Sequence, residues 1–173
     1  NQELINFKNR YQLDKAILGN IITKNFSLEE HYFLINKGSR SGVKKDMIAI
    51  YKFQIIGKVI QVFNWYSKIL LITDHKSKIS AFTNNTNAPG IVVGNNQINK
   101  YEMIYTSHLY KIEKDDFIIS SGKGLIFPEG FCLGKIQKHS KQGIYHKIEI
   151  VPLIDFKNIE YCLLTNQEKL NAF

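Results

Sequence analysis

Residues 116–136 read D-F-I-I-S-S-G-K-G-L-I-F-P-E-G-F-C-L-G-K-I, two short apolar runs on either side of a turn rich in glycine. Runs of this length bounded by turn residues are typical of β-strands, and we expect strands at 117–120 and 131–138. The second run contains Gly134. A glycine inside a strand indicates a bend or the close approach of another backbone, as at the corner of a small barrel.

An echo of this stretch occurs earlier in the chain. Residues 56–61, I-G-K-V-I-Q, resemble residues 133–137, L-G-K-I-Q, and each segment follows a turn that contains glycine. Two related small barrels would produce such an echo. A chance similarity between two hairpins is the alternative.

The rest of the chain after residue 15 continues the β pattern. Short apolar runs recur, separated by turn residues about every 8–12 residues, and this spacing favours barrels or sandwiches. Residues 84–90 are rich in asparagine and end in Pro89-Gly90, so we expect a domain boundary there, with one barrel at 16–86 and another at 87–173. The other expected strands are 16–24, 31–36, 47–51, 55–63, 69–73, 79–83, 91–93, 103–106, 144–151 and 162–165.

Residues 1–15 follow a different pattern. Leu4, Phe7 and Tyr11 recur at the spacing of one narrow apolar seam on a helix. We interpret this segment as the end of a longer coiled-coil helix, through which the protein can self-associate. The alternative is a lone amphipathic helix packed on its own domain.

Composition and charge limit the class of protein. The 173 residues are 44% hydrophobic and 22% charged, which is close to the globular average and excludes wholesale disorder. The net charge of +8 fits nucleic acid, anionic lipid or an acidic polymer as a partner. The lysines are scattered, with only Lys44 and Lys45 adjacent, which favours a solvated surface and no nucleic-acid partner. A basic OB-like barrel that binds nucleic acid remains the alternative.

Motifs for catalysis, metals and cofactors are missing from the sequence. Residues 38–42, G-S-R-S-G, place Arg40 where a nucleophile elbow needs serine, and residues 122–124 are too short for a phosphate loop. The five histidines show no paired spacing suited to a metal. We therefore expect no catalytic, cofactor or metal site, with a secreted hydrolase as the minor alternative because triad residues meet only in the fold. Cys132 and Cys162 are too few for a disulfide framework, and whether they are bonded stays open.

Three segments, in order over about residues 16–155, resemble the family of rod shape-determining proteins called MreC. Residues 35–47, I-N-K-G-S-R-S-G-V-K-K-D-M, are similar to its I-N-K-G-S-x-x-G-V-x-x-G-M stretch. Residues 57–59, G-K-V, with 70–74, L-L-I-T-D, resemble its G-x-V and L-L-T-D patterns. Residues 116–136 resemble its G-D-x-V-x-T-S-G-x-G-G-x-F-P-x-G-L-x-V-G-x-V stretch. Asp46, Asp115 and Leu125 stand where that family usually has glycine.

The resemblance implies a fold and a role. The fold would be two small six-stranded barrels like those of trypsin-type proteases, without an active site, after the end of a coiled-coil helix. The protein would be a non-catalytic scaffold of the bacterial elongation complex, which builds lateral cell wall and maintains rod or helical shape. Its partners would include an elongation-specific class B penicillin-binding transpeptidase, and also MreD, RodA and MreB through the full-length chain. It would sit in the inner membrane by a single span outside this sequence, with these residues in the periplasm.

Three aromatic residues are candidates for the partner-binding surface. Phe127, Phe131 and Tyr145 lie in or beside stretches flanked by turns, where an exposed aromatic can anchor an interface. Tyr145 follows the hairpin turn at Gly143 and is the best candidate. For Phe127 and Phe131 the alternative is that both plug the end of a barrel.

Overall fold

The computed structural model describes residues 16–124 and 126–166, and it is an all-β fold with a single 3₁₀ turn, η2 (Ser39–Ser41), in this part of the chain. The helix expected at residues 1–15 lies outside the described residues. No helix in the described ranges has the length and apolar character needed to span a bilayer.

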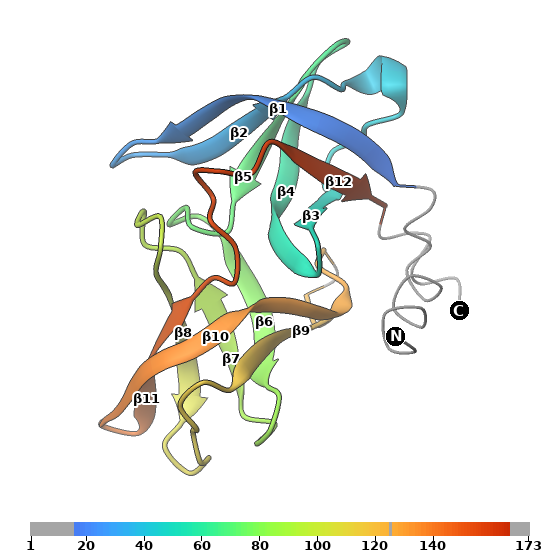
Figure 1. The fold of residues 1–173 in the computed structure, drawn as a ribbon. Coiled ribbons are helices and arrows are strands. Elements are labelled where there is room, and N and C mark those ends of the chain that lie inside the picture. The colour runs from blue at the N-terminus through green and yellow to red at the C-terminus, as the bar shows by residue number, and fades with distance from the viewer. Residues whose placement is uncertain (1–15, 125, 167–173) are drawn as a thin grey trace.

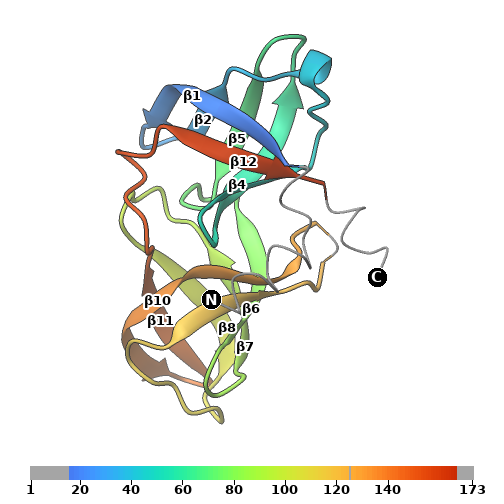
Figure 2. The same cartoon turned by 45° about the vertical axis from the view of Figure 1, so that its right-hand side comes forward.

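Six antiparallel strands close the first barrel. The ring of pairings runs from β12 through β1, β2, β5, β4 and β3 back to β12. Their bounds are β1 (Ile17–Phe26), β2 (His31–Ile35), β3 (Ile48–Tyr51), β4 (Gln54–Val62), β5 (Ser67–Leu71) and β12 (Tyr161–Thr165). Figure 2 shows β12, in red, alongside β1, in blue.

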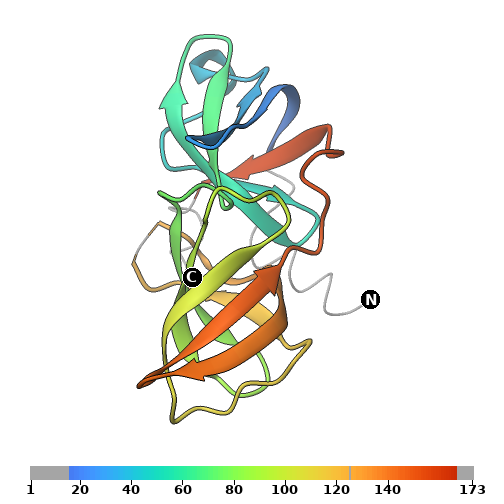
Figure 3. The ribbon, with the colours of Figure 1, turned by 90° about the vertical axis from the view of Figure 1, so that its left-hand side faces the viewer.

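Six further strands close the second barrel in the same way. The ring runs β6, β7, β8, β11, β10, β9 and back to β6. Their bounds are β6 (Lys78–Thr83), β7 (Pro89–Val93), β8 (Tyr101–Ser107), β9 (Phe117–Ser121), β10 (Glu129–Gln142) and β11 (Tyr145–Val151). The two barrels lie end to end and give the molecule an elongated shape (Figures 1 and 3).

The strand pairing divides the chain differently from the boundary that we expected between 16–86 and 87–173. Strand β6 pairs with β7 and β9, so residues 84–88 form a hairpin turn inside the second barrel, and Pro89 and Gly90 begin β7 and are not a hinge. Strand β12 returns to the first barrel, where it pairs with β1 and β3. The chain therefore passes between the barrels twice, at residues 72–77 and 152–160.

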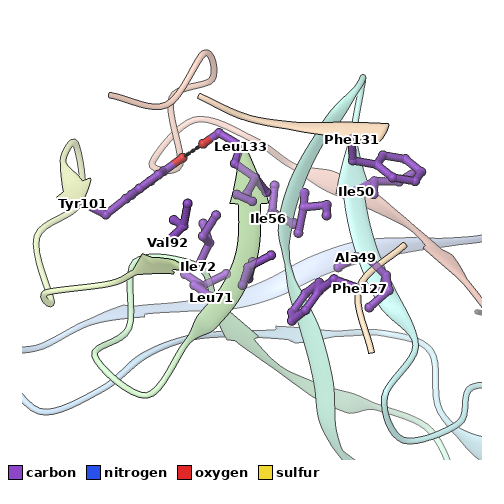
Figure 4. Close-up of a cluster of buried hydrophobic side chains, with 14 of the residues drawn as sticks. Ala49, Ile50, Ile56, Leu71, Ile72, Val92, Tyr101, Phe127, Phe131 and Leu133 are labelled. Atoms are coloured by element: carbon purple, nitrogen blue, oxygen red, sulfur yellow. Dashed lines mark hydrogen bonds between the residues drawn. The ribbon is translucent and has the colours of Figure 1, made fainter. Parts of the chain in front are cut away.

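A buried polar network joins the two barrels. The amide of Gln54, on β4, donates to the Tyr101 hydroxyl at 3.2 Å and accepts from the Leu153 backbone N–H at 2.8 Å. The Tyr101 hydroxyl donates to the Leu133 carbonyl, and burial raises the pKa of Tyr101, so the hydroxyl keeps the proton that it donates. One hydrophobic core runs through both barrels around this network (Figure 4). Because these buried groups are hydrogen-bonded, the junction avoids the cost of unsatisfied polar atoms.

The glycines of the sequence echo are confirmed as points of close backbone approach. A Cβ at Gly57 would overlap the Leu70 carbonyl oxygen, and one at Gly134 would overlap that of Val151. Asp46 and Asp115 take φ of 69° and 68°, so these turns do use the left-handed conformation for which glycine is suited. Aspartate adopts that conformation more readily than most residues, which explains how the turns survive the replacement.

Candidate partner-binding surface

Phe127 and Phe131 are not on the accessible surface. Phe131, on β10, is fully buried, and Phe127, in the loop before it, is buried as well. Both belong to the core shared by the barrels, where Figure 4 draws them close to β3 residues Ala49 and Ile50. This burial contradicts the expectation that Phe127 and Phe131 anchor an interface. Both instead pack in the core between the barrels, which agrees with the alternative that they plug the end of a barrel.

Tyr145 is accessible and has an aromatic neighbour that the sequence did not reveal. It is the first residue of β11, with its side chain 41% exposed. Its ring meets the ring of Tyr105, on β8, edge to face, with centroids 5.8 Å apart and planes at 68°. Tyr105 is 62% exposed. Two large rings are thus held together in solvent, although burying them would stabilise the fold.

A β-bulge places Tyr105 in this position. His146 pairs with Thr106, whereas Ile148 pairs with Met103, so β8 has one residue more than β11 between these pairs. Tyr105 takes φ of 63° at the bulge. A bulky residue rarely adopts this strained conformation, and such strain clusters at functional sites. The bulge turns the Tyr105 side chain out of the regular alternation.

Three further large hydrophobic residues are exposed in the loop after β8 and in the β10–β11 turn, and hydrogen bonds fix the backbone that carries them. The His108 N–H donates to the carbonyl of Ile144 at 2.8 Å. The Nε2–H of the buried His146 donates to the carbonyl of Tyr110 at 2.8 Å. The five exposed residues, here called the tyrosine surface, are Tyr105, Leu109, Tyr110, Ile144 and Tyr145.

An open hollow of about 560 Å³ lies beside the tyrosine surface, with Tyr105 and Tyr110 in its wall. Its other wall comes from β6, β7 and the ends of β9 and β10, and its charged members are Lys123 and Glu129, of opposite sign. Pockets that accept a ligand group measure about 300–1,000 Å³. The hollow can therefore accept an apolar side chain of a partner without a net charge to oppose it.

The described residues offer little to a chemical step. No group of three or more histidine, cysteine or acidic residues among them could hold a metal ion. The buried Ser120 hydroxyl donates to the Pro128 carbonyl at 2.5 Å and accepts from the Phe131 N–H at 3.0 Å, which is a structural role. Cys132 and Cys162 are both free thiols. Burial raises the pKa of Cys132, and that of Cys162 to about 12, so neither is a ready thiolate nucleophile.

This arrangement places the protein in the class of double-β-barrel proteins. The chain belongs to the MreC family: the family model described as "Rod shape-determining protein MreC, barrel core" matches residues 21–166. The resemblance read from the three sequence segments is thereby confirmed. The family is named for cell shape and not for a reaction.

Curated relatives agree with this assignment. The cell shape-determining protein MreC of Listeria monocytogenes is 32% identical over 133 residues, which cover 73% of this chain and 45% of that protein. MreC of Escherichia coli is 28% identical over 135 residues, covering 76% of this chain and 36% of that protein. The chain thus spans less than half the length of these relatives.

Solved structures share the fold. The crystal structure of MreC from Pseudomonas aeruginosa superposes with a TM-score of 0.83 at 23% identity and covers 88% of this chain and 100% of its own. MreC from Helicobacter pylori, in a complex with penicillin-binding protein PBP2, gives a TM-score of 0.64 at 17% identity, covering 87% of this chain and 98% of the other. At these identities the likeness concerns the fold alone.

Proposed function

We propose that this chain is a non-catalytic scaffold of the bacterial elongation complex and that its tyrosine surface binds the extracytoplasmic domain of a class B penicillin-binding transpeptidase. In this role it organises lateral cell-wall synthesis and maintains rod or helical cell shape. The observation that carries the proposal is the Tyr105–Tyr145 pair, two aromatic rings kept in solvent by a strained bulge. Exposed apolar patches of this kind mark interaction sites.

The choice of partner is supported by the fold. MreC from Helicobacter pylori shares this fold and was solved in a complex with PBP2. The full-length protein would hold these barrels outside the cytoplasm by a single span of the inner membrane. Contacts with MreD, RodA and MreB would be made through the full-length chain.

The contact would be apolar and dominated by a few rings. None of the five residues of the tyrosine surface is charged. Anchors of an interface typically cost about 2 kcal/mol or more when truncated to alanine, which is about 30-fold in affinity. Salt screens charged contacts and leaves apolar ones in place.

The test is surface plasmon resonance with the extracytoplasmic domain of the cognate transpeptidase. A Tyr105→Ala, Tyr145→Ala double variant should bind at least about 30-fold more weakly, and wild-type binding should persist in about 0.5 M salt. Tyr161→Ala is the matched control, because Tyr161 is 44% exposed and meets Tyr51 edge to face at 5.3 Å on the other barrel. Equal affinity of the double variant and the wild type, with both folded, rejects this surface.

A further inference from the structure

A second exposed aromatic group lies at the opposite end of the molecule. The turn from β4 to β5 ends the first barrel, far from the β10–β11 hairpin beside the tyrosine surface (Figures 1 and 3). Trp65, the only tryptophan of the chain, is 68% exposed in this turn. Phe63 and Tyr66, on either side of Trp65 in the sequence, stack their rings on each other, with centroids 4.4 Å apart and planes at 20°. The proposed transpeptidase contact accounts for none of these side chains.

The turn is held rigidly against η2. The Ser39 N–H donates to the Phe63 carbonyl at 2.8 Å, and the Arg40 N–H donates to the Asn64 carbonyl at 3.2 Å. A Cβ at Gly38 would overlap the Phe63 carbonyl oxygen, so glycine is what lets the two segments meet. The Arg40 guanidinium carbon lies 4.6 Å from the Trp65 ring centroid, in a cation–π contact. We call Arg40, Phe63, Trp65 and Tyr66 the aromatic tip.

The charge around the aromatic tip is mostly positive. Residues 35–45 and 62–68 contain four lysines and one arginine but no aspartate or glutamate. Lys68 is neutralised by Glu30 at 3.3 Å. The other cations are Lys37, Arg40, Lys44 and Lys45, with no carboxylate in these two segments to balance them. The tip therefore combines amphipathic rings with an excess of positive charge, although the exposed Asp46 directly follows Lys45.

A bilayer surface fits this combination better than other anionic partners. Tryptophan and tyrosine settle at the headgroup level, where one side of the ring is apolar and the other wet. Lysine and arginine near anionic lipid contribute about 1 kcal/mol each. A nucleic-acid strand instead needs a groove that tracks its backbone, with several stacking platforms in a row. The β4–β5 turn that carries the three rings projects from the end of the first barrel (Figure 1).

We propose that the aromatic tip docks peripherally on an anionic lipid bilayer, with Trp65 among the headgroups and Arg40 and its neighbouring lysines on the lipid phosphates. Because the tip and the tyrosine surface are at opposite ends, both can be occupied at once. A barrel pair that rests on its tip presents the tyrosine surface away from the membrane.

Trp65 is itself the probe for the test, since the whole tryptophan signal of the chain comes from the tip. Vesicles of equal parts phosphatidylglycerol and phosphatidylcholine should shift its emission to shorter wavelength, and brominated lipid should quench it. Vesicles of phosphatidylcholine alone should do neither. Raising the salt to about 0.5 M should reverse binding, because it screens the attraction between cations and lipid.

Co-sedimentation with the same vesicles tests the residues. Arg40→Gln and Lys44→Gln should each weaken binding about fivefold, the fold-change equivalent of about 1 kcal/mol. Lys138→Gln and Lys147→Gln, at exposed positions on the second barrel, are the matched controls and should not change it. Emission that ignores anionic vesicles overturns the proposal. An emission shift produced only by a mixed-sequence oligonucleotide would also overturn it and would assign the tip to nucleic acid. A shift produced only by raising the protein concentration would assign the tip to a second copy of the chain.

Discussion

Replacing Phe131 by alanine separates its structural role from a role in binding. The ring is fully buried in the core that the two barrels share, and the residue precedes Cys132, where β10 pairs with β4 at Gln54. Removing a buried phenylalanine side chain costs about 3–5 kcal/mol, counting both lost burial and the cavity left behind. For a chain of this length that corresponds to a fall in melting temperature of about 6–20 °C.

Urea unfolding of the Phe131→Ala variant should be followed by two probes. Far-ultraviolet circular dichroism reports both barrels, and Trp65 emission reports the first barrel. Because Phe131 links the barrels, both probes should report one transition in which the free energy of unfolding has fallen by about 3–5 kcal/mol. Phe117→Ala, at a half-exposed position on β9, is the control and should cost about 1 kcal/mol or less. A Phe131→Ala variant that keeps its stability but loses its transpeptidase partner would refute the reasoning from burial.

Three further changes have definite expected outcomes. Burial lowers the pKa of His31, so the free energy of unfolding should fall as the pH drops below the unfolded-state pKa near 6.5. In urea unfolding at about pH 7.5 and 5.5, His31→Asn should reduce this loss of stability. An equal loss in the variant and the wild type would contradict the prediction. Gly57→Ala should destabilise the fold by about 1–3 kcal/mol, because the new Cβ overlaps the Leu70 carbonyl oxygen. Asp46→Gly should not destabilise it, because glycine adopts the left-handed conformation of this position without strain. A lower melting temperature for Asp46→Gly than for Gly57→Ala would disprove this reasoning. Gln54→Leu should cost about 1–3 kcal/mol, because it removes the acceptor of the Leu153 N–H and one of the two partners of the buried Tyr101 hydroxyl, and a neutral result in chemical unfolding would show that water replaces the amide.

The barrels could be predicted from the sequence because their signals are local. Alternating apolar runs between turns gave the strands, and the glycines at 57 and 134 marked the close backbone approaches. The pairing of β12 with β1 and β3 has no local signal, since it joins residues more than a hundred positions apart. The turn at 84–90 looked like a hinge because hairpin turns and linkers use the same residues.

The candidate surface was only half predictable, for a related reason. Tyr145 follows a hairpin turn, and turns are exposed. Phe131 also follows a turn, but the first barrel covers it, which no local pattern shows. Tyr105 was missed because its exposure depends on a bulge, and tyrosine is not a residue that signals the left-handed conformation.

Hydrogen–deuterium exchange of this chain, alone and bound to the extracytoplasmic domain of its transpeptidase, tests the central claim most directly. Binding through the tyrosine surface predicts that amides of residues 104–110 and 143–146 become protected, while those of the β4–β5 turn at 63–66 and of residues 161–165 do not. Protection confined to the first barrel, with residues 104–110 and 143–146 unchanged in the saturated complex, would contradict the account.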